Sequence, residues 1–273
     1  MAVQVRPNGI TTATAPLTLT RTPYVTQASI YYVDSVTGSD SNTGLLQEKP
    51  KATVFGASGA LSVASSSAST LIVCLATHRE TVSSSYAWGV IGAMIIGLGS
   101  GTSRPTFTSA VAGIMLDMTG ANAGECWLEN LVFAASTAAT TARISTDEAG
   151  LTIKDCQFNC GANDTADTVL ITGLVYARTI SGCTFTVTAS GAARGLRINS
   201  GGSHVVIEDC TFDGGAYGWA GDACGFVTTA CPLFRIRNLT LSNYSDLNIG
   251  VSGCKGYISG YTIDATSSWQ WTL

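Results

Sequence analysis

The strongest constraint on this chain is a repeat of six eight-residue units in its second half. When the units are aligned, the third, sixth and eighth positions hold an apolar or aromatic residue in every unit. The third positions follow one another at spacings of 25, 27, 27, 29 and 22 residues, a period typical of solenoids in which each repeat makes one turn. The units are Cys126–Phe133, Leu151–Phe158, Arg178–Phe185, Val205–Phe212, Phe234–Leu241 and Gly256–Ile263.

Position five of each unit is expected to form a corner. Positions six and eight alternate as in a β-strand, but the step from three to six does not, so the backbone must bend between them. Position five is always Asn, Asp or Gly, which tolerate the left-handed αL conformation. These residues are Asn130, Asp155, Gly182, Asp209, Asn238 and Gly260. Short strands joined by such corners predict an all-β fold, a single-stranded parallel β-helix.

The sixth position of three successive units is a cysteine. Stacking places Cys156, Cys183 and Cys210 in one inward column between Leu131 and Leu239. Neighbouring strands lie about 4.8 Å apart, so a disulfide is sterically allowed, but we expect reduced thiols that pack as small hydrophobic groups. The nine cysteines include no CxxC pair, so we expect neither a metal site nor a cofactor.

A short helix is expected between Lys51 and Val63, where it would cap the first turn of the coil. Apolar residues recur there at helical spacing, at Val54, Phe55, Ala57, Ala60 and Leu61.

Residues 1–29 differ from the rest of the chain. They contain no acidic residue, and Pro7, Pro16 and Pro23 favour extended backbone. We therefore divide the chain into an N-terminal arm, residues 1–29, and a β-helix, residues 30–273. Segments with alternating apolar residues would pair with a partner protein as added strands. Two arginines supply the only positive side chains of the arm. The expected partner-binding residues are Val3, Val5, Arg6, Leu17, Leu19 and Arg21.

Several segments resemble the opening of pectate-lyase-like right-handed parallel β-helix proteins, and the resemblance covers about residues 30–264. The segments are Ile30–Asp34, Gly38–Gly44, Lys49–Thr53, Thr70–Val73, His78–Val82 and Ile95–Gly99. The resemblance implies a right-handed coil. It is not specific for function, because the superfamily includes polysaccharide lyases and hydrolases, phage tailspikes and non-catalytic virion proteins.

Enzymes of that superfamily place acidic residues on one outer face across adjacent turns. Here the outward fourth column pairs Glu129 with Lys154 and Glu208 with Arg237, and the seventh column is mostly threonine, so we expect no catalytic residue. The alternative candidates are acids in the segments between turns and two arginines, Asp164, Asp167, Asp213, Asp222, Arg235 and Arg237. The segment Asp40–Gly44 could hold calcium, but a turn is the simpler interpretation.

Charge and hydropathy narrow the choice of function. A net charge of -4 with 14 scattered basic residues argues against nucleic-acid binding, and no apolar run has the length of a membrane span. The first residues include no apolar core of a secretory signal, which indicates synthesis in a host cytoplasm.

Three functions remain open. The first is a virion structural protein, a phage capsid decoration or cement protein whose arm docks on the major capsid protein or another virion protein, as a homotrimer. The second is a phage tail fibre or tailspike that binds, and in some forms cleaves, a surface polysaccharide. The third is a free polysaccharide lyase or glycoside hydrolase. We expect the first, because the outer face has no row of carboxylates.

Overall fold

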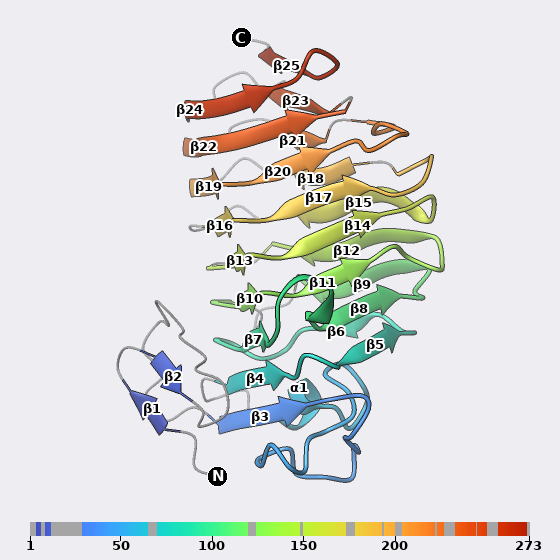
Figure 1. Cartoon of the computed structure of the whole chain (residues 1–273), viewed down its shortest axis with the longest axis vertical. Coiled ribbons are helices and arrows are strands. Elements are labelled where there is room, and N and C mark those ends of the chain that lie inside the picture. Colours follow the sequence, from blue (N-terminus) through green and yellow to red (C-terminus); the bar gives the residue numbers. More distant parts are fainter. Residues whose placement is uncertain are drawn as a thin grey trace.

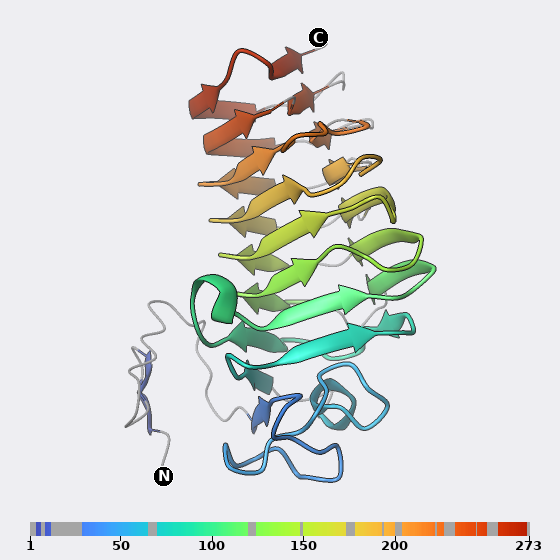
Figure 2. The same cartoon turned by 45° about the vertical axis from the view of Figure 1, so that its right-hand side comes forward.

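A computed structural model of the chain shows a parallel β-helix whose turns, here called rungs, stack along one axis (Figures 1 and 2). It describes residues 4–6, 9–11, 29–64, 70–119, 124–147, 150–172, 178–192, 194–199, 204–221, 223–226, 233–243, 245–249 and 256–271. Three walls enclose the core, and each rung contributes strands to the walls in turn. The strands of each wall pair in parallel with those of the neighbouring rungs, as the sequence predicts.

The first two walls belong to one 15-stranded sheet, because β22 runs through the corner between them. The first wall consists of β3 (Ser29–Val33), β4 (Thr70–Cys74), β7 (Met94–Gly97), β10 (Trp127–Glu129), β13 (Thr152–Lys154), β16 (Arg178–Ser181), β19 (His204–Glu208), β22 (Leu233–Ser242) and β24 (Gly256–Ile263). The second wall consists of β5 (Arg79–Val82), β8 (Thr106–Ser109), β11 (Val132–Ala134), β14 (Gln157–Cys160), β17 (Thr184–Val187), β20 (Thr211–Asp213) and the ends of β22 and β24.

The third wall is a separate eight-stranded sheet that the eight-residue units do not include. Its inward residues Leu116, Ile144, Val169 and Leu196 lie in register and are fully buried. Its strands are β6 (Tyr86–Ala87), β9 (Gly113–Met118), β12 (Thr140–Thr146), β15 (Asp164–Ile171), β18 (Arg194–Ile198), β21 (Cys224–Phe226), β23 (Asp246–Ile249) and β25 (Ser268–Trp271).

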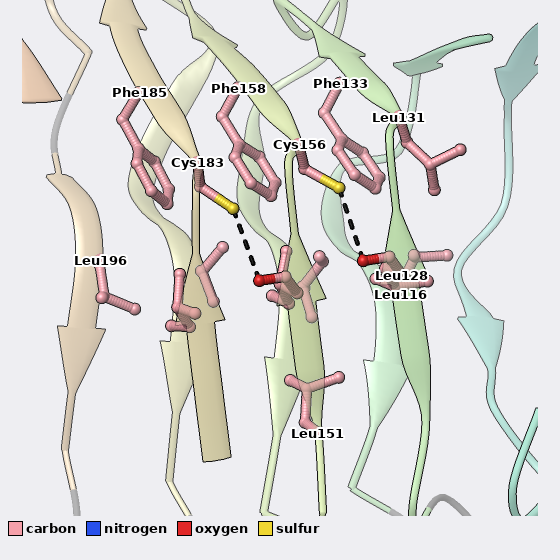
Figure 3. Packing of buried hydrophobic residues seen from close by; sticks show 14 of the residues in the cluster. Leu116, Leu128, Leu131, Phe133, Leu151, Cys156, Phe158, Cys183, Phe185 and Leu196 are labelled. Atoms are coloured by element: carbon pink, nitrogen blue, oxygen red, sulfur yellow. Dashed lines mark hydrogen bonds between the residues drawn. The ribbon is translucent and has the colours of Figure 1, made fainter. Parts of the chain in front are cut away.

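The third positions of the units stack in the interior, as predicted. Leu128 pairs with Ile153, and the column continues in register through Ile180, Ile207, Ile236 and Ile258. The eighth positions of the first four units form a ladder of phenylalanine rings (Figure 3), and successive centroids from Phe133 to Phe212 are separated by 4.8, 4.7 and 4.6 Å. Each ring buries a large apolar area against the next rung, so the stack stabilises itself without a ligand.

The cysteine column is buried and unbridged. Cys156, Cys183 and Cys210 are free thiols that are each 1% exposed. The Sγ of Cys156 donates a hydrogen bond to the Leu128 carbonyl one rung away, and Cys183 donates to that of Ile153 (Figure 3). The thiols therefore pack as small hydrophobic groups that also satisfy backbone acceptors.

The corner residues adopt the left-handed conformation that the repeat requires. Their φ values lie between 51° and 62° at Asn130, Asp155, Gly182, Asp209, Asn238 and Gly260. Corner side chains also bond across rungs: the Nδ2 atom of Asn130 donates to the Gly97 carbonyl, and that of Asn238 donates to the Oδ1 atom of Asp209.

The N-terminal cap contains less helix than the sequence predicts. The helix α1 covers only Ala60–Val63, and Ala57, expected on its buried face, is exposed. Residues 51–59 instead form turns, because the buried Glu80 carboxylate accepts the backbone N–H groups of Val54 (2.7 Å) and Phe55 (3.0 Å). These bonds hold the segment over the first rungs without helical geometry.

The β-helix begins close to the predicted boundary, and the described residues of the arm pair with one another. The strand β3 begins at Ser29, one residue before the predicted start of the β-helix. The strands β1 (Gln4–Arg6) and β2 (Gly9–Thr11) form an antiparallel hairpin in which Val5 pairs with Ile10, so this part of the arm is a hairpin within the chain. The other expected partner-binding residues, Val3, Leu17, Leu19 and Arg21, lie outside the described residues.

Candidate functional site

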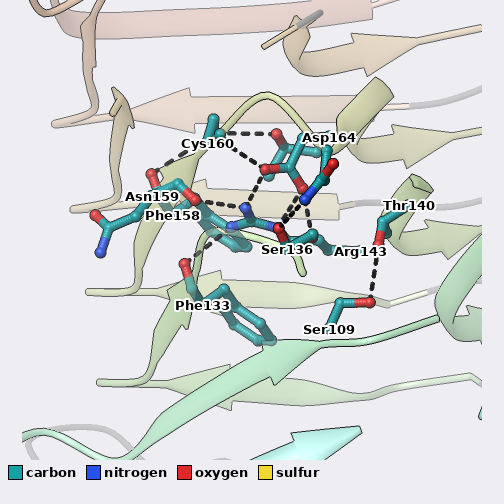
Figure 4. A network of polar contacts seen from close by, with 12 residues as sticks. Ser109, Phe133, Ser136, Thr140, Arg143, Phe158, Asn159, Cys160 and Asp164 are labelled. Atoms are coloured by element: carbon teal, nitrogen blue, oxygen red, sulfur yellow. Dashed lines mark hydrogen bonds and ion pairs between the residues drawn. The ribbon is translucent and has the colours of Figure 1, made fainter. Parts of the chain in front are cut away.

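Asp164 lies in a buried polar network where the second and third walls meet (Figure 4). It begins the strand β15 and is not in a connecting loop as expected, and its side chain is 5% exposed. Its Oδ1 and Oδ2 atoms accept bonds from the Nε (3.0 Å) and Nη2 (2.6 Å) of Arg143. This two-point contact is the strongest geometry available to an arginine and a carboxylate.

The remaining groups around the ion pair are also satisfied. Ser136 Oγ and the backbone N–H of Gly161 each donate to Asp164 at 2.6 Å. Arg143 in turn donates to the carbonyl groups of Phe133 and Asn159, at the strands β11 and β14. With four donors the Asp164 carboxylate is held in one position, and through Arg143 it joins the strands β11, β12, β14 and β15.

Asp167 lies three residues further along β15 and is held by different arginines. Its oxygens lie 3.6 Å from Arg194 Nη1 and 3.5 Å from Arg197 Nη1, both on the next rung. Burial raises the pKa of Asp167 above its ordinary value, against the opposing effect of the two arginines. The group is thus a cross-strand ion-pair centre with one carboxylate and two guanidinium groups.

The other predicted site residues are dispersed. Asp213 ends β20 on the second wall, where its Oδ1 accepts the Gly215 N–H (2.9 Å) and the Asn243 side-chain amide (2.7 Å). Arg235 and Arg237 lie on β22, and Arg237 bonds Glu208 at 2.8 Å. Asp222 lies outside the described residues. Asp164 and Asp167 lie on the third wall and Asp213 lies on the second, and each carboxylate bonds to partners of its own.

The outer surface of the first two walls has the opposite-charge pairs expected from the columns. Lys154 Nζ lies 2.6 Å from Glu129 Oε1, and the Arg237–Glu208 pair lies further along the same column. Thr184, Thr211, Thr240 and Thr262 stack in register on the second wall. These contacts hold neighbouring strands together by short-range attraction and present little net charge.

The Asp40–Gly44 segment is organised by a lysine. The Lys51 ammonium donates to the carbonyl groups of Asp40 (3.0 Å) and Ser58 (2.9 Å), and the Asp40 carboxylate accepts the backbone N–H groups of Ala52 and Thr53. The positive charge that these carbonyl groups face is therefore the Lys51 ammonium group. Among the described residues, no group of three His, Cys, Asp or Glu side chains is arranged to hold a metal ion.

The buried thiols are poor nucleophiles. Burial raises the pKa of Cys160 to about 11 and that of Cys183 well above its ordinary value. Because only the thiolate reacts, both groups are protonated and inert at neutral pH.

Comparisons with known proteins found no relative of this chain. No family model matches the chain, and neither a curated protein nor a solved structure matches it. Within the described part of the chain, no helix has the length and apolar character needed to cross a membrane.

The repeat in the sequence did not identify Arg143, the partner of Asp164 in the buried polar network. It lies in β12 and is 1% exposed, in a segment of otherwise small and apolar residues. The only available signal was a lone arginine within a predicted solenoid, 21 residues before Asp164. The eight-residue alignment omitted the third wall and so gave Arg143 no position in a column.

Proposed function

We propose that this chain is a non-enzymatic structural protein of a virion, in the simplest case a phage capsid decoration or cement protein anchored by its N-terminal arm. The observation that carries the proposal is that the described candidate acids already serve the coil. Asp164 accepts four bonds, Asp167 faces two arginines and Asp213 caps a turn. In each case the printed contacts of the carboxylate are to groups of the coil itself, which supports a structural role for these acids.

The character of the rod supports the same proposal. Its core is a continuous stack of isoleucine, phenylalanine and cysteine columns, and its outer face carries compensated charges and threonine. Such a rod is stable without a ligand. The resemblance to the pectate-lyase-like superfamily, which includes non-catalytic virion proteins, is consistent with a projecting structural part.

The arm supplies the means of attachment in this proposal. The hairpin of β1 and β2 pairs through three residue pairs and leaves strand edges on which a partner strand can add. In this proposal the arm docks on the major capsid protein or another virion protein, and three copies assemble as a homotrimer.

One observation favours the second candidate, a tail fibre or tailspike that binds a surface polysaccharide. Tyr217 is 59% exposed on the segment that follows β20, and Trp219 nearby donates its indole N–H to Ser245 Oγ at 3.1 Å. Aromatic rings on a polar surface suit stacking against sugar rings.

The test uses particles of the virus whose genome encodes the chain, prepared without this protein. Full-length chain and a variant that lacks residues 1–28 are added to the particles, and occupancy is measured after purification. We expect the full chain to bind in a fixed ratio and the truncated chain to be lost, with both showing the same β-rich circular dichroism. Equal occupancy of the truncated chain would contradict anchoring by the arm.

A second measurement separates the structural role from an enzymatic one. The full chain is incubated with capsular and lipopolysaccharide glycans of the host, and released reducing ends or unsaturated products are quantified. We expect no turnover. Turnover that disappears in Asp213→Asn would replace the proposal with a depolymerase, and binding without turnover that is lost in Tyr217→Ala would favour the fibre.

A further inference from the structure

The strand β24 belongs to the last rung at the C-terminal end of the stack (Figure 2), and its inward side chains are only partly buried. One rung earlier, Ile236 is fully buried and Leu239 and Leu241 are each 1% exposed. In β24 the equivalent residues are Ile258 and Ile263, which are only half-buried, and Tyr261, which is 51% exposed. The apolar core therefore reaches solvent at this end.

The strand β24 is also the last strand of its sheet in the described part of the chain. Among the described residues, β24 pairs only with β22. Proteins usually protect such an edge with charged side chains, because its free N–H and C=O groups can pair with another strand. The sequence of β24, GYISGYTI, carries no charge, whereas β22 carries Arg235 and Arg237. A second copy of this strand would meet no like-charge repulsion.

The N-terminal end of the stack is closed. Ala60 and Leu61 of α1 are buried, and Glu80 fastens the capping segment through the backbone of Val54 and Phe55. Head-to-tail stacking of copies would need this cap to move. The uncharged strand β24 therefore finds a matching surface at the same end of another copy.

From these observations we infer that the C-terminal rung is a self-association surface, on which two copies meet end to end about a twofold axis. The strand β24 bends at Gly260, so a twofold axis through this corner places its first-wall half against the second-wall half of the other copy. In the antiparallel register centred between Ser259 and Gly260, Ile258 lies opposite Tyr261 of the second copy and Tyr257 lies opposite its Thr262.

This register is self-complementary in the way that an isologous interface requires. Ile258 and Tyr261 both occupy inward columns, so inward apolar side chains meet inward apolar side chains at both symmetric positions. Tyr257 and Thr262 are both exposed and lie in outward columns. The core would continue from one copy into the other, and the open backbone groups of β24 would be paired. The inference does not depend on the proposed virion role.

Sedimentation velocity of the full 273-residue chain tests the inference. We expect a dimer, or an even multiple if a lateral trimer also forms, in a concentration-dependent equilibrium. Tyr261→Lys should abolish the end-to-end step because it places two equivalent charges in the apolar contact. The matched control is Tyr217→Lys, since Tyr217 is similarly exposed at 59% but lies away from β24, and it should associate like the unmodified chain.

The register is tested by cross-linking with oxidised glutathione. The double variant Tyr257→Cys/Thr262→Cys should give a disulfide-linked dimer, and Tyr257→Cys alone should not, because position 257 lies opposite 262 and not opposite itself. A monomer at every concentration overturns the inference. Equal association of Tyr261→Lys, or equal cross-linking of the single cysteine variant, overturns it as well.

Discussion

At the scale of single residues, the coil depends on backbone conformations that few side chains tolerate. The six corner residues all have φ values near +57°, and the side-chain amides of Asn130 and Asn238 bond to the corners of the preceding rungs. At Gly182 glycine also avoids a contact, because a Cβ atom there would overlap Oδ1 of Asp155 on the preceding rung and the Asp155 side chain would have to move. The corner column therefore combines a conformational requirement with a steric one.

This steric requirement predicts the effect of Gly182→Ala. We expect the free energy of unfolding to fall by about 2 kcal/mol, because alanine adds left-handed backbone strain and a contact with Asp155. The measurement is a urea unfolding curve followed by circular dichroism. Gly89→Ala is the control, since a Cβ atom there meets no atom within 4 Å, and its stability should change by less than about 0.5 kcal/mol. Equal effects of the two variants would contradict the role of the corner.

At the scale of strands, polar residues join the walls where hydrophobic columns cannot. The Arg143–Asp164 pair links β12 and β15, and Arg143 also reaches the carbonyl groups at β11 and β14. A buried pair of this kind is costly to separate, because the remaining partner is left as an uncompensated charge in the interior.

We therefore expect Arg143→Met to lower the free energy of unfolding by about 3–5 kcal/mol. The double variant Arg143→Met/Asp164→Asn should recover part of this loss, because the amide is neutral, its Oδ1 can still accept the Gly161 N–H, and its Nδ2 can donate to Ser136 Oγ. Lys154→Met is the control: Lys154 is one-third exposed in its pair with Glu129, and its loss should cost about 1 kcal/mol or less. If the double variant were no more stable than Arg143→Met, the unpaired carboxylate would not be the cause.

At the scale of the whole molecule, the continuous core makes most of its thiols inaccessible. Seven of the nine cysteines are free and buried, and the other two lie outside the described residues. Burial raises the pKa of Cys74, Cys160 and Cys183, so these thiols are protonated as well as covered.

We expect Ellman's reagent to react rapidly with at most two thiols in the native protein at neutral pH, and with all nine after unfolding in urea without reductant. Absorbance at the thionitrobenzoate band gives both counts. A third rapidly reacting thiol would contradict a closed core, and fewer than nine after unfolding would indicate a disulfide.

The sequence by itself determined the coil, its period, the inward columns and the corners, because a stacked repeat imposes the same local requirement on every rung. That requirement is visible as identical residue types at Ile153, Ile180 and Ile207. Only the tertiary structure decided the third wall, the short cap and the roles of Asp164 and Asp167. Their partners, Arg143 and Arg194, lie on other rungs of the third wall, and the eight-residue units do not include this wall, so these pairs have no position in an aligned column. Whether an acid serves catalysis or the fold depends on the side chains that happen to face it across the stack, and that proximity exists only after the chain has wound.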